Sequence, residues 1–283
     1  MGVFRSLSVV ALLLWTSSLS SFDLGSLDPL KVTEILTKGV KSFGEVPVEK
    51  EIQMGRDLSA GLLGTMPLVD DPPVQSYVNH IGRWLAMQTE RPDLPWTFAV
   101  IDTDTVNAFA APGGYVFVTR GLFLMLRNEA ELAGVIGHEI SHVLRKHHLV
   151  AIEKQMRASL ATDVAGMMVE YDSDMVDALV GAGMEIYGKG LDRDDEFEAD
   201  RMGVVVAARS GYDPYGLPAM LMTLYERGEG DQSLAFLFST HPPTTDRLEQ
   251  LDTEMQGRMD QFSGAAGQTE RFKTMQARLR SDA

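Results

Sequence analysis

The stretch that decides the fold is residues 128–142, which read NEAELAGVIGHEISH. Residues four apart lie one above the other on a helix, so His138 and His142 can bind one metal ion from the same face. Glu139 lies beside them and is placed to take a proton from a water molecule on that ion. The spacing therefore predicts a site for metal-assisted hydrolysis, provided that the stretch is helical.

The flanking residues favour a helix. Asn128 is a good N-cap, and Glu131 follows three residues later, as in a capping box. A basic run at residues 145–148 suits the later turns, because cations stabilise the C-terminal end of a helix. We therefore expect one helix that begins after Asn128 and continues into this run. The alternative is an amphipathic helix whose two histidines bind no metal. In both cases the apolar residues of this stretch recur at helical spacing: Leu132, Val135, Ile136, Ile140, Val143 and Leu144.

Composition excludes several kinds of protein. With 283 residues and 45% hydrophobic content, the chain can form one large domain or two small ones. Its net charge of -15 disfavours nucleic acid and an anionic membrane surface as partners. The chain has no cysteine, which excludes disulfides, a thiol nucleophile and cysteine metal sites. Any metal ligands must therefore be His, Asp or Glu.

The N-terminus reads as a secretory signal over residues 1–20, with Arg5, a short apolar run and small residues before the expected cleavage point. No stretch reaches the roughly twenty apolar residues that a transmembrane helix needs. We therefore expect an exported protein with no transmembrane span after signal removal. We divide the rest into a lead-in at 21–44, a catalytic domain at 45–262 and a helical tail at 263–283.

The catalytic domain is predicted to be α+β and mainly α-helical. Helices are expected at 48–63 and, after a turn at 71–73, at 74–87, with a strand at 96–101 and a hairpin at 107–119. These strands predict a small antiparallel sheet beside the metal helix, with an edge able to pair with an extended peptide. Residues 155–190, rich in glycine and methionine, are a candidate mobile cover over the cleft.

A tetrahedral zinc site needs a third protein ligand. His148 follows His138 by ten residues, but that arrangement needs a glycine at position 145, where Arg145 stands. If the helix continues, His147 and His148 point away from the metal face. We therefore predict that these two histidines lie on the surface. The isolated His80 is predicted to be a packed or solvated side chain and not a ligand.

A better third ligand lies in the acidic stretch 192–201. Glu196 and Asp200 share one face of the helix that this stretch opens. Glu196 can complete the metal site, while Asp200 can accept the free N–H of a ligating histidine and fix its tautomer. The alternative is an acidic helix start stabilised only by the helix dipole.

Three motifs follow one another along the chain, at residues 107–114, 128–142 and 193–200. Together they resemble the CaaX-prenyl-protease and HtpX family of zinc metallopeptidases, most closely its soluble periplasmic members implicated in outer-membrane protein quality control. The similarity runs from about Glu49 to Arg247. Unlike HtpX-like members, the chain shows no series of membrane spans, and no helical repeat follows Arg247. The motifs are residues 128–142, the run 107–114 and the Arg193-x-x-Glu196-x-x-Ala199-Asp200 element.

The resemblance implies a zincin-like (gluzincin) fold with one Zn²⁺ per chain, bound by His138, His142 and Glu196. It makes Glu139 the general base and Asp200 a proton donor, whereas the residues themselves favour Asp200 as an orienting group. It also implies a periplasmic endopeptidase acting on misfolded or unassembled envelope polypeptides. The alternative is a zinc-containing, chaperone-like binding protein with little turnover.

One further histidine belongs to the predicted site. Ser239-Thr240-His241-Pro242-Pro243 precedes a predicted helix, and the similar periplasmic enzymes have a like His-Pro segment. His241 is expected either to stabilise the oxyanion of the tetrahedral intermediate or to cap the zinc in a resting state. A surface histidine with no role is the alternative.

Overall fold

The computed structural model describes residues 46–162, 181, 185, 188–228, 230–241, 244–264 and 269–281. The predicted signal at 1–20, the lead-in at 21–44 and most of the proposed cover at 155–190 lie outside these residues. Within the described part of the chain, no helix combines the length and the apolar composition needed to cross a bilayer.

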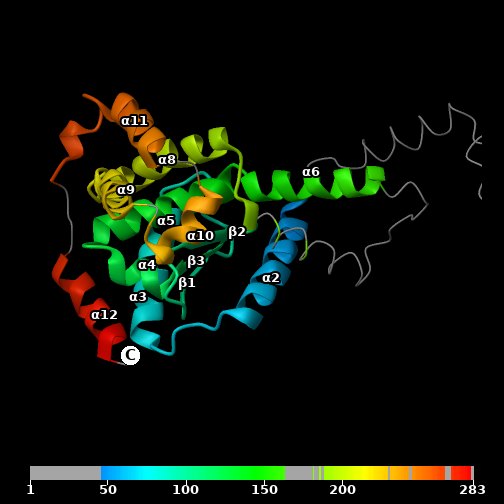
Figure 1. Ribbon diagram of the computed structural model, residues 1–283, viewed down its shortest axis with the longest axis horizontal. Coiled ribbons are helices and arrows are strands. Elements are labelled where there is room, and N and C mark those ends of the chain that lie inside the picture. The colour runs from blue at the N-terminus through cyan, green and yellow to red at the C-terminus, as the bar shows by residue number, and fades with distance from the viewer. Residues whose placement is uncertain are drawn as a thin grey trace, which may run out of the picture. The chain divides into compact units, whose positions relative to one another are not determined.

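Helix α5 (Glu129–Leu144) contains the H-E-x-x-H motif, and all of its residues are buried. Its start is as predicted, because the Asn128 side chain accepts a hydrogen bond from the Glu131 amide at 2.9 Å. The Glu131 carboxylate accepts from the Arg127 amide, one residue before the cap. Figure 1 shows α5 between the sheet and helices α8 and α9, and it contacts all three.

The sheet has three strands in the order β1-β3-β2: β1 (Thr97–Ile101), β2 (Ala108–Ala111) and β3 (Tyr115–Thr119). The hairpin of β2 and β3 is antiparallel as predicted, with Phe109 opposite Phe117. The prediction of an antiparallel sheet is wrong for β1, which pairs parallel to β3, so the sheet is mixed. Alternating side chains indicate strands but not which strands become neighbours.

The remaining elements surround α5 and the sheet, and they confirm the predicted α+β, mainly helical class. α2 packs on β2 and β3, α3 packs on β1 and α5, and α8 packs along α5. Their bounds are α2 (Val48–Thr65), α3 (Pro72–Ala86), α4 (Arg120–Met125), α6 (His147–Thr162), α8 (Arg193–Arg209), α9 (Gly216–Arg227), α10 (Ala235–Thr240), α11 (Thr244–Met255) and α12 (Thr269–Ser281), with 3-10 turns η2 (Gln232–Leu234) and η3 (Asp260–Phe262).

The predicted tail helix, α12, packs on the domain as expected. Its apolar face is buried against α3 and α4, with Phe272 and Leu279 inaccessible to solvent. Arg271 forms an ion pair with the buried carboxylate of Glu129, the first residue of α5. The hydroxyls of Tyr77 and Tyr212 donate to the same carboxylate. The tail is therefore part of the support of the metal helix.

Two glycines allow α5 and α8 to approach closely. A Cβ atom on Gly203 would lie 2.7 Å from the backbone nitrogen of His138, and one on Gly137 would lie 2.8 Å from the carbonyl oxygen of Gly203. Real Cβ atoms do not make such short contacts with backbone, so any side chain here would force the helices apart. The close approach brings the acidic start of α8 to the histidines of α5.

Gly203→Ala should therefore separate α5 from α8 and lower the free energy of unfolding by about 1–3 kcal/mol, the usual cost of overpacking. The matched control is Gly64→Ala in α2, where a Cβ would meet nothing within 4 Å. There, alanine should be neutral or stabilising, because it favours a helix more than glycine does. Urea denaturation of both variants gives the comparison, and equal stabilities would contradict the close-approach argument.

Candidate active site

His138 and His142 point their Nε2 atoms at the same spot. The two atoms are 3.0 Å apart, and both side chains are buried. The Nδ1 atom of His138 lies 2.9 Å from the carboxylate of Asp200, which can only accept, so the ring proton of a neutral His138 is on Nδ1. Its Nε2 then presents a lone pair toward His142. A bound cation would stabilise this arrangement.

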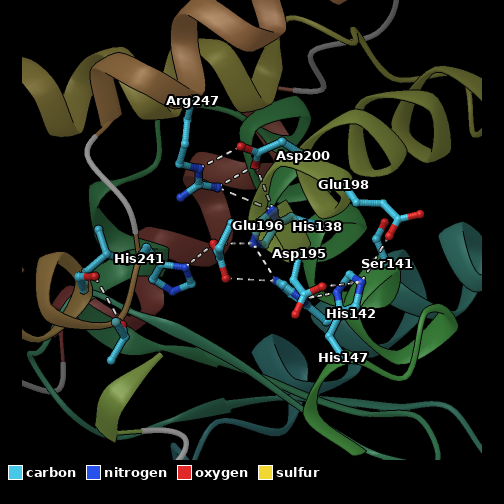
Figure 2. A network of polar contacts seen from close by, with 12 residues as sticks. His138, Ser141, His142, His147, Asp195, Glu196, Glu198, Asp200, His241 and Arg247 are labelled. Atoms are coloured by element: carbon cyan, nitrogen blue, oxygen red, sulfur yellow. Dashed lines mark hydrogen bonds and ion pairs between the residues drawn. The ribbon is translucent and has the colours of Figure 1, made fainter. Parts of the chain in front are cut away.

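Glu196 adds a carboxylate from α8 to the two imidazoles. Its Oε1 is 3.4 Å from His142 Nε2, and its Oε2 is 3.6 Å from His138 Nε2. Glu196 is 1% exposed. Glu198, the other acidic candidate in this stretch, instead pairs with Arg145 at 2.9 Å on another side of the helix. Figure 2 shows Glu196 facing both histidines.

The spacing of these three side chains is close to that of metal ligands. Bonds of 2.0–2.2 Å in a tetrahedral zinc site place the ligand atoms about 3.3 Å from each other. The two Nε2 atoms are 3.0 Å apart, and each lies at a comparable distance from a different oxygen of Glu196, 3.4 Å from Oε1 for His142 and 3.6 Å from Oε2 for His138. Two imidazoles and a carboxylate are also a set found in catalytic zinc sites. The residues His138, His142 and Glu196 can therefore bind one divalent cation.

Asp200 lies behind His138 and not beside the other two ligands. Its Oδ1 and Oδ2 accept hydrogen bonds from the Arg247 guanidinium at 2.6 and 2.7 Å, while Oδ1 also faces His138. Arg247 comes from α11 and is buried. Sequence reasoning missed Arg247, because an arginine in an amphipathic helix gives no sign of which carboxylate it will meet in the fold.

His241 reaches the same group from the end of α10, where it is the C-cap residue. Its Nδ1 atom lies 2.6 Å from Glu196 Oε2. Single donor atoms of His138, Glu196 and His241 all lie within 4.8 Å of one another, so they form a second possible metal-binding set. The two sets share His138 and Glu196, and they differ in whether His142 or His241 completes them.

The predicted surface positions of His147 and His148 are wrong. Helix α5 ends at Leu144, and Lys146 takes a left-handed conformation with φ of 59°. This residue interrupts the helix without the glycine that such a conformation favours. His147 is consequently 6% exposed and contacts His142, and His148 lines the cleft. His80, by contrast, is exposed on α3.

The cleft in front of the donor atoms is lined by Glu139, His142, Glu196 and His241 on one side. Strand β2 and the residue before it form another wall, from Asn107 to Phe109. Because β2 is an outer strand of the sheet, an extended chain in the cleft would run beside it. Glu139 therefore lines the same cleft as His142 and Glu196.

Charge and burial act in opposite directions on the acidic groups. Burial raises the pKa of Glu196, but nearby His241 and His138 outweigh it and lower this pKa to about 2. Burial also raises the pKa of Asp200, but the Arg247 guanidinium holds it well below its usual range. For Glu139, burial dominates and raises the pKa. Glu196 is therefore anionic, as a ligand must be, and Glu139 is a stronger base than an exposed glutamate.

Comparison with known proteins gives the family. The model of peptidase family M48 matches residues 72–255. The chain belongs to peptidase family M48. The match includes α5, β2 and α8 and so every residue of the proposed metal site. It confirms at family level the resemblance seen in the motifs.

Similar M48 proteins come from bacteria and from mitochondria. The chain is 34% identical over 218 residues to the beta-barrel assembly-enhancing protease of Escherichia coli strain K12, covering 74% of this chain and 45% of that protein. It is 31% identical to a putative protease of the same name from Vibrio cholerae, covering 78% of this chain and 46% of that protein. It is 28% identical to the mitochondrial metalloendopeptidase OMA1 of Schizosaccharomyces pombe, covering 75% and 63%. The chain thus spans about half the length of its bacterial relatives.

Asp200→Asn should lower the free energy of unfolding at pH 7 by about 3–5 kcal/mol, because the buried Arg247 would lose its charged partner. The pKa of Asp200 is depressed in the folded protein, so its contribution is present above its unfolded value, about 3.9, and is lost as pH falls below that value. The variant should therefore lose less stability than the wild type when the pH is lowered from about 5 to about 3, an interval that includes the unfolded value.

Urea denaturation of the metal-free proteins tests this expectation. The control is Asp104→Asn, whose carboxylate is 87% exposed and pairs with Arg120 at the surface. That change should cost at most about 1 kcal/mol. Equal effects of the two substitutions would contradict a special role for the Asp200 carboxylate.

Proposed function

We propose that the protein is a zinc-dependent metalloendopeptidase. The observation that carries the proposal is the convergence of two imidazoles from α5 and one carboxylate from α8 at ligand spacing. Membership of peptidase family M48 supports hydrolysis of peptide bonds by this set. We assign the metal ligands to His138, His142 and Glu196, with one Zn²⁺ per chain.

In this mechanism Glu139 is the general base. A bound zinc ion lowers the pKa of water and polarises the peptide carbonyl. Glu139 accepts the proton of the attacking water, since it faces the cleft and its pKa is raised by burial. It then passes the proton to the leaving amine. Asp200 holds the His138 ring and its tautomer, a role that its pairing with Arg247 supports better than proton donation.

We infer that the substrates are misfolded or unassembled polypeptides of the bacterial envelope, met in the periplasm after export by residues 1–20. The similarity to the beta-barrel assembly-enhancing protease of Escherichia coli supports this class. The outer strand β2 along the cleft supports binding of an extended chain through main-chain hydrogen bonds, which does not require a particular sequence.

We also infer that His241 caps the metal in a resting state. Its ring occupies the open side of the proposed site and contacts Glu196, so it competes with substrate for the position in front of the metal. A substrate that enters the cleft must then displace the end of α10. The competing role, stabilisation of the oxyanion, requires the same residue to remain in place during turnover.

Glu139→Gln should abolish degradation of an unfolded protein, because glutamine cannot accept the proton of the attacking water. The zinc content should stay unchanged, because Glu139 is not one of the proposed metal ligands. Turnover and bound zinc are measured in parallel, on protein purified without added metal. Glu249→Gln, an exposed glutamate of α11, is the control and should behave as wild type. A Glu139→Gln protein that retains its cellular function would point instead to a zinc-containing binding protein.

His241→Ala should keep its zinc and degrade an unfolded protein faster than the wild type, because the cap is removed. A fall in turnover at full zinc content would contradict the cap and support the oxyanion role. Unchanged turnover with an unchanged pH profile would exclude His241 from the site. Glu139→Gln/His241→Ala is the control and should remain inactive, which excludes a contaminating protease.

A further inference from the structure

His142 has a second partner on the side facing away from the proposed metal. Its Nδ1 atom lies 2.9 Å from Nδ1 of His147, and both rings are buried. His147 is the first residue of α6 and comes directly after the left-handed turn at Lys146. Figure 2 shows its ring beside His142, on the side away from Glu196.

The contacts define which nitrogen carries each proton. His142 presents Nε2 to His138 and Glu196, so a metal ion in that position would be bound by Nε2. A neutral histidine bound in this way has its proton on Nδ1 and needs an acceptor there. His147 Nδ1 is that acceptor, which leaves the proton of His147 on Nε2. That Nε2 faces the carboxylates of Glu198 at 3.3 Å and Asp195 at 3.6 Å.

We propose that His147 is a positioning residue that holds the ring and the tautomer of His142 for metal binding. The inference rests on the proposed zinc site. It gives each ligating histidine its own support: His138 is held by a carboxylate and His142 by a neutral imidazole. An imidazole accepts a hydrogen bond less strongly than a carboxylate does. The ring of His142 therefore keeps more of its neutral character than the ring of His138.

Several contacts hold His147 in place. The Lys146 ammonium lies 3.8 Å from the buried carboxylate of Glu51, which also forms two hydrogen bonds with Arg91 at 2.8 and 2.9 Å. Arg145, the C-cap of α5, pairs with Glu198 at 2.9 Å, and Glu198 in turn faces His147. The turn is thus fixed at both ends, and the ring it presents has a defined orientation.

Three substitutions separate the acceptor role from simple space filling. In His147→Asn the side-chain oxygen takes the place of Nδ1 and can still accept from His142. In His147→Gln the amide lies instead near the place of Nε2, and His147→Ala removes both groups. His80→Ala, an exposed histidine of α3, is the matched control for the loss of an imidazole.

Zinc affinity is measured by competition with a chelator, and the visible spectrum of the Co²⁺-loaded protein reports the ligand geometry. We expect His147→Ala and His147→Gln to bind zinc about 10–100-fold more weakly, with an altered Co²⁺ spectrum. His147→Asn and His80→Ala should stay close to wild type. Urea denaturation of each metal-free variant shows whether the fold is retained.

The proposal is overturned if His147→Ala binds zinc as tightly as wild type. It is also overturned if folded His147→Asn loses as much affinity as His147→Ala, because the residue would then act by volume alone. Failure of the proposed function is a different outcome, in which the wild-type protein itself binds no zinc or Co²⁺.

Discussion

The contact of two glycines across α5 and α8 is the constraint on which the site depends. Gly203 meets the backbone of His138 directly, so the helices lie closer than helices with side chains at the crossing. Glu196 and Asp200 precede Gly203 by seven and three residues and therefore share its face of α8. One crossing point thus brings a ligand and its supporting carboxylate to the metal helix together.

The partners of the buried carboxylates at the site determine the charge that each one carries. Asp200 is compensated by Arg247, and Glu196 is surrounded by imidazoles. Glu139 alone has a pKa dominated by burial, which raises it. In the proposed mechanism, carboxylates of similar intrinsic acidity are thereby divided into anions that bind or orient and one that exchanges a proton.

Sequence reasoning predicted what depends on local spacing. The helix cap at Asn128, the face shared by His138 and His142, and the acidic face at Glu196 all follow from helical periodicity. The parallel pairing of β1, the turn at Lys146 and the partner of Arg247 depend on tertiary contacts. Lys146 has no glycine to signal a left-handed conformation, and the buried Glu51 that lies near it is 95 residues earlier.

The ion pair between Glu129 and Arg271 joins the first residue of α5 to the last helix of the chain. Until α12 has been synthesised and docked, the buried Glu129 has no cation beside it, and two tyrosine hydroxyls alone oppose the cost of burying its charge. The folding of the metal helix is therefore completed late. Without the docked α12, the start of α5 would keep a buried carboxylate that lacks its guanidinium partner.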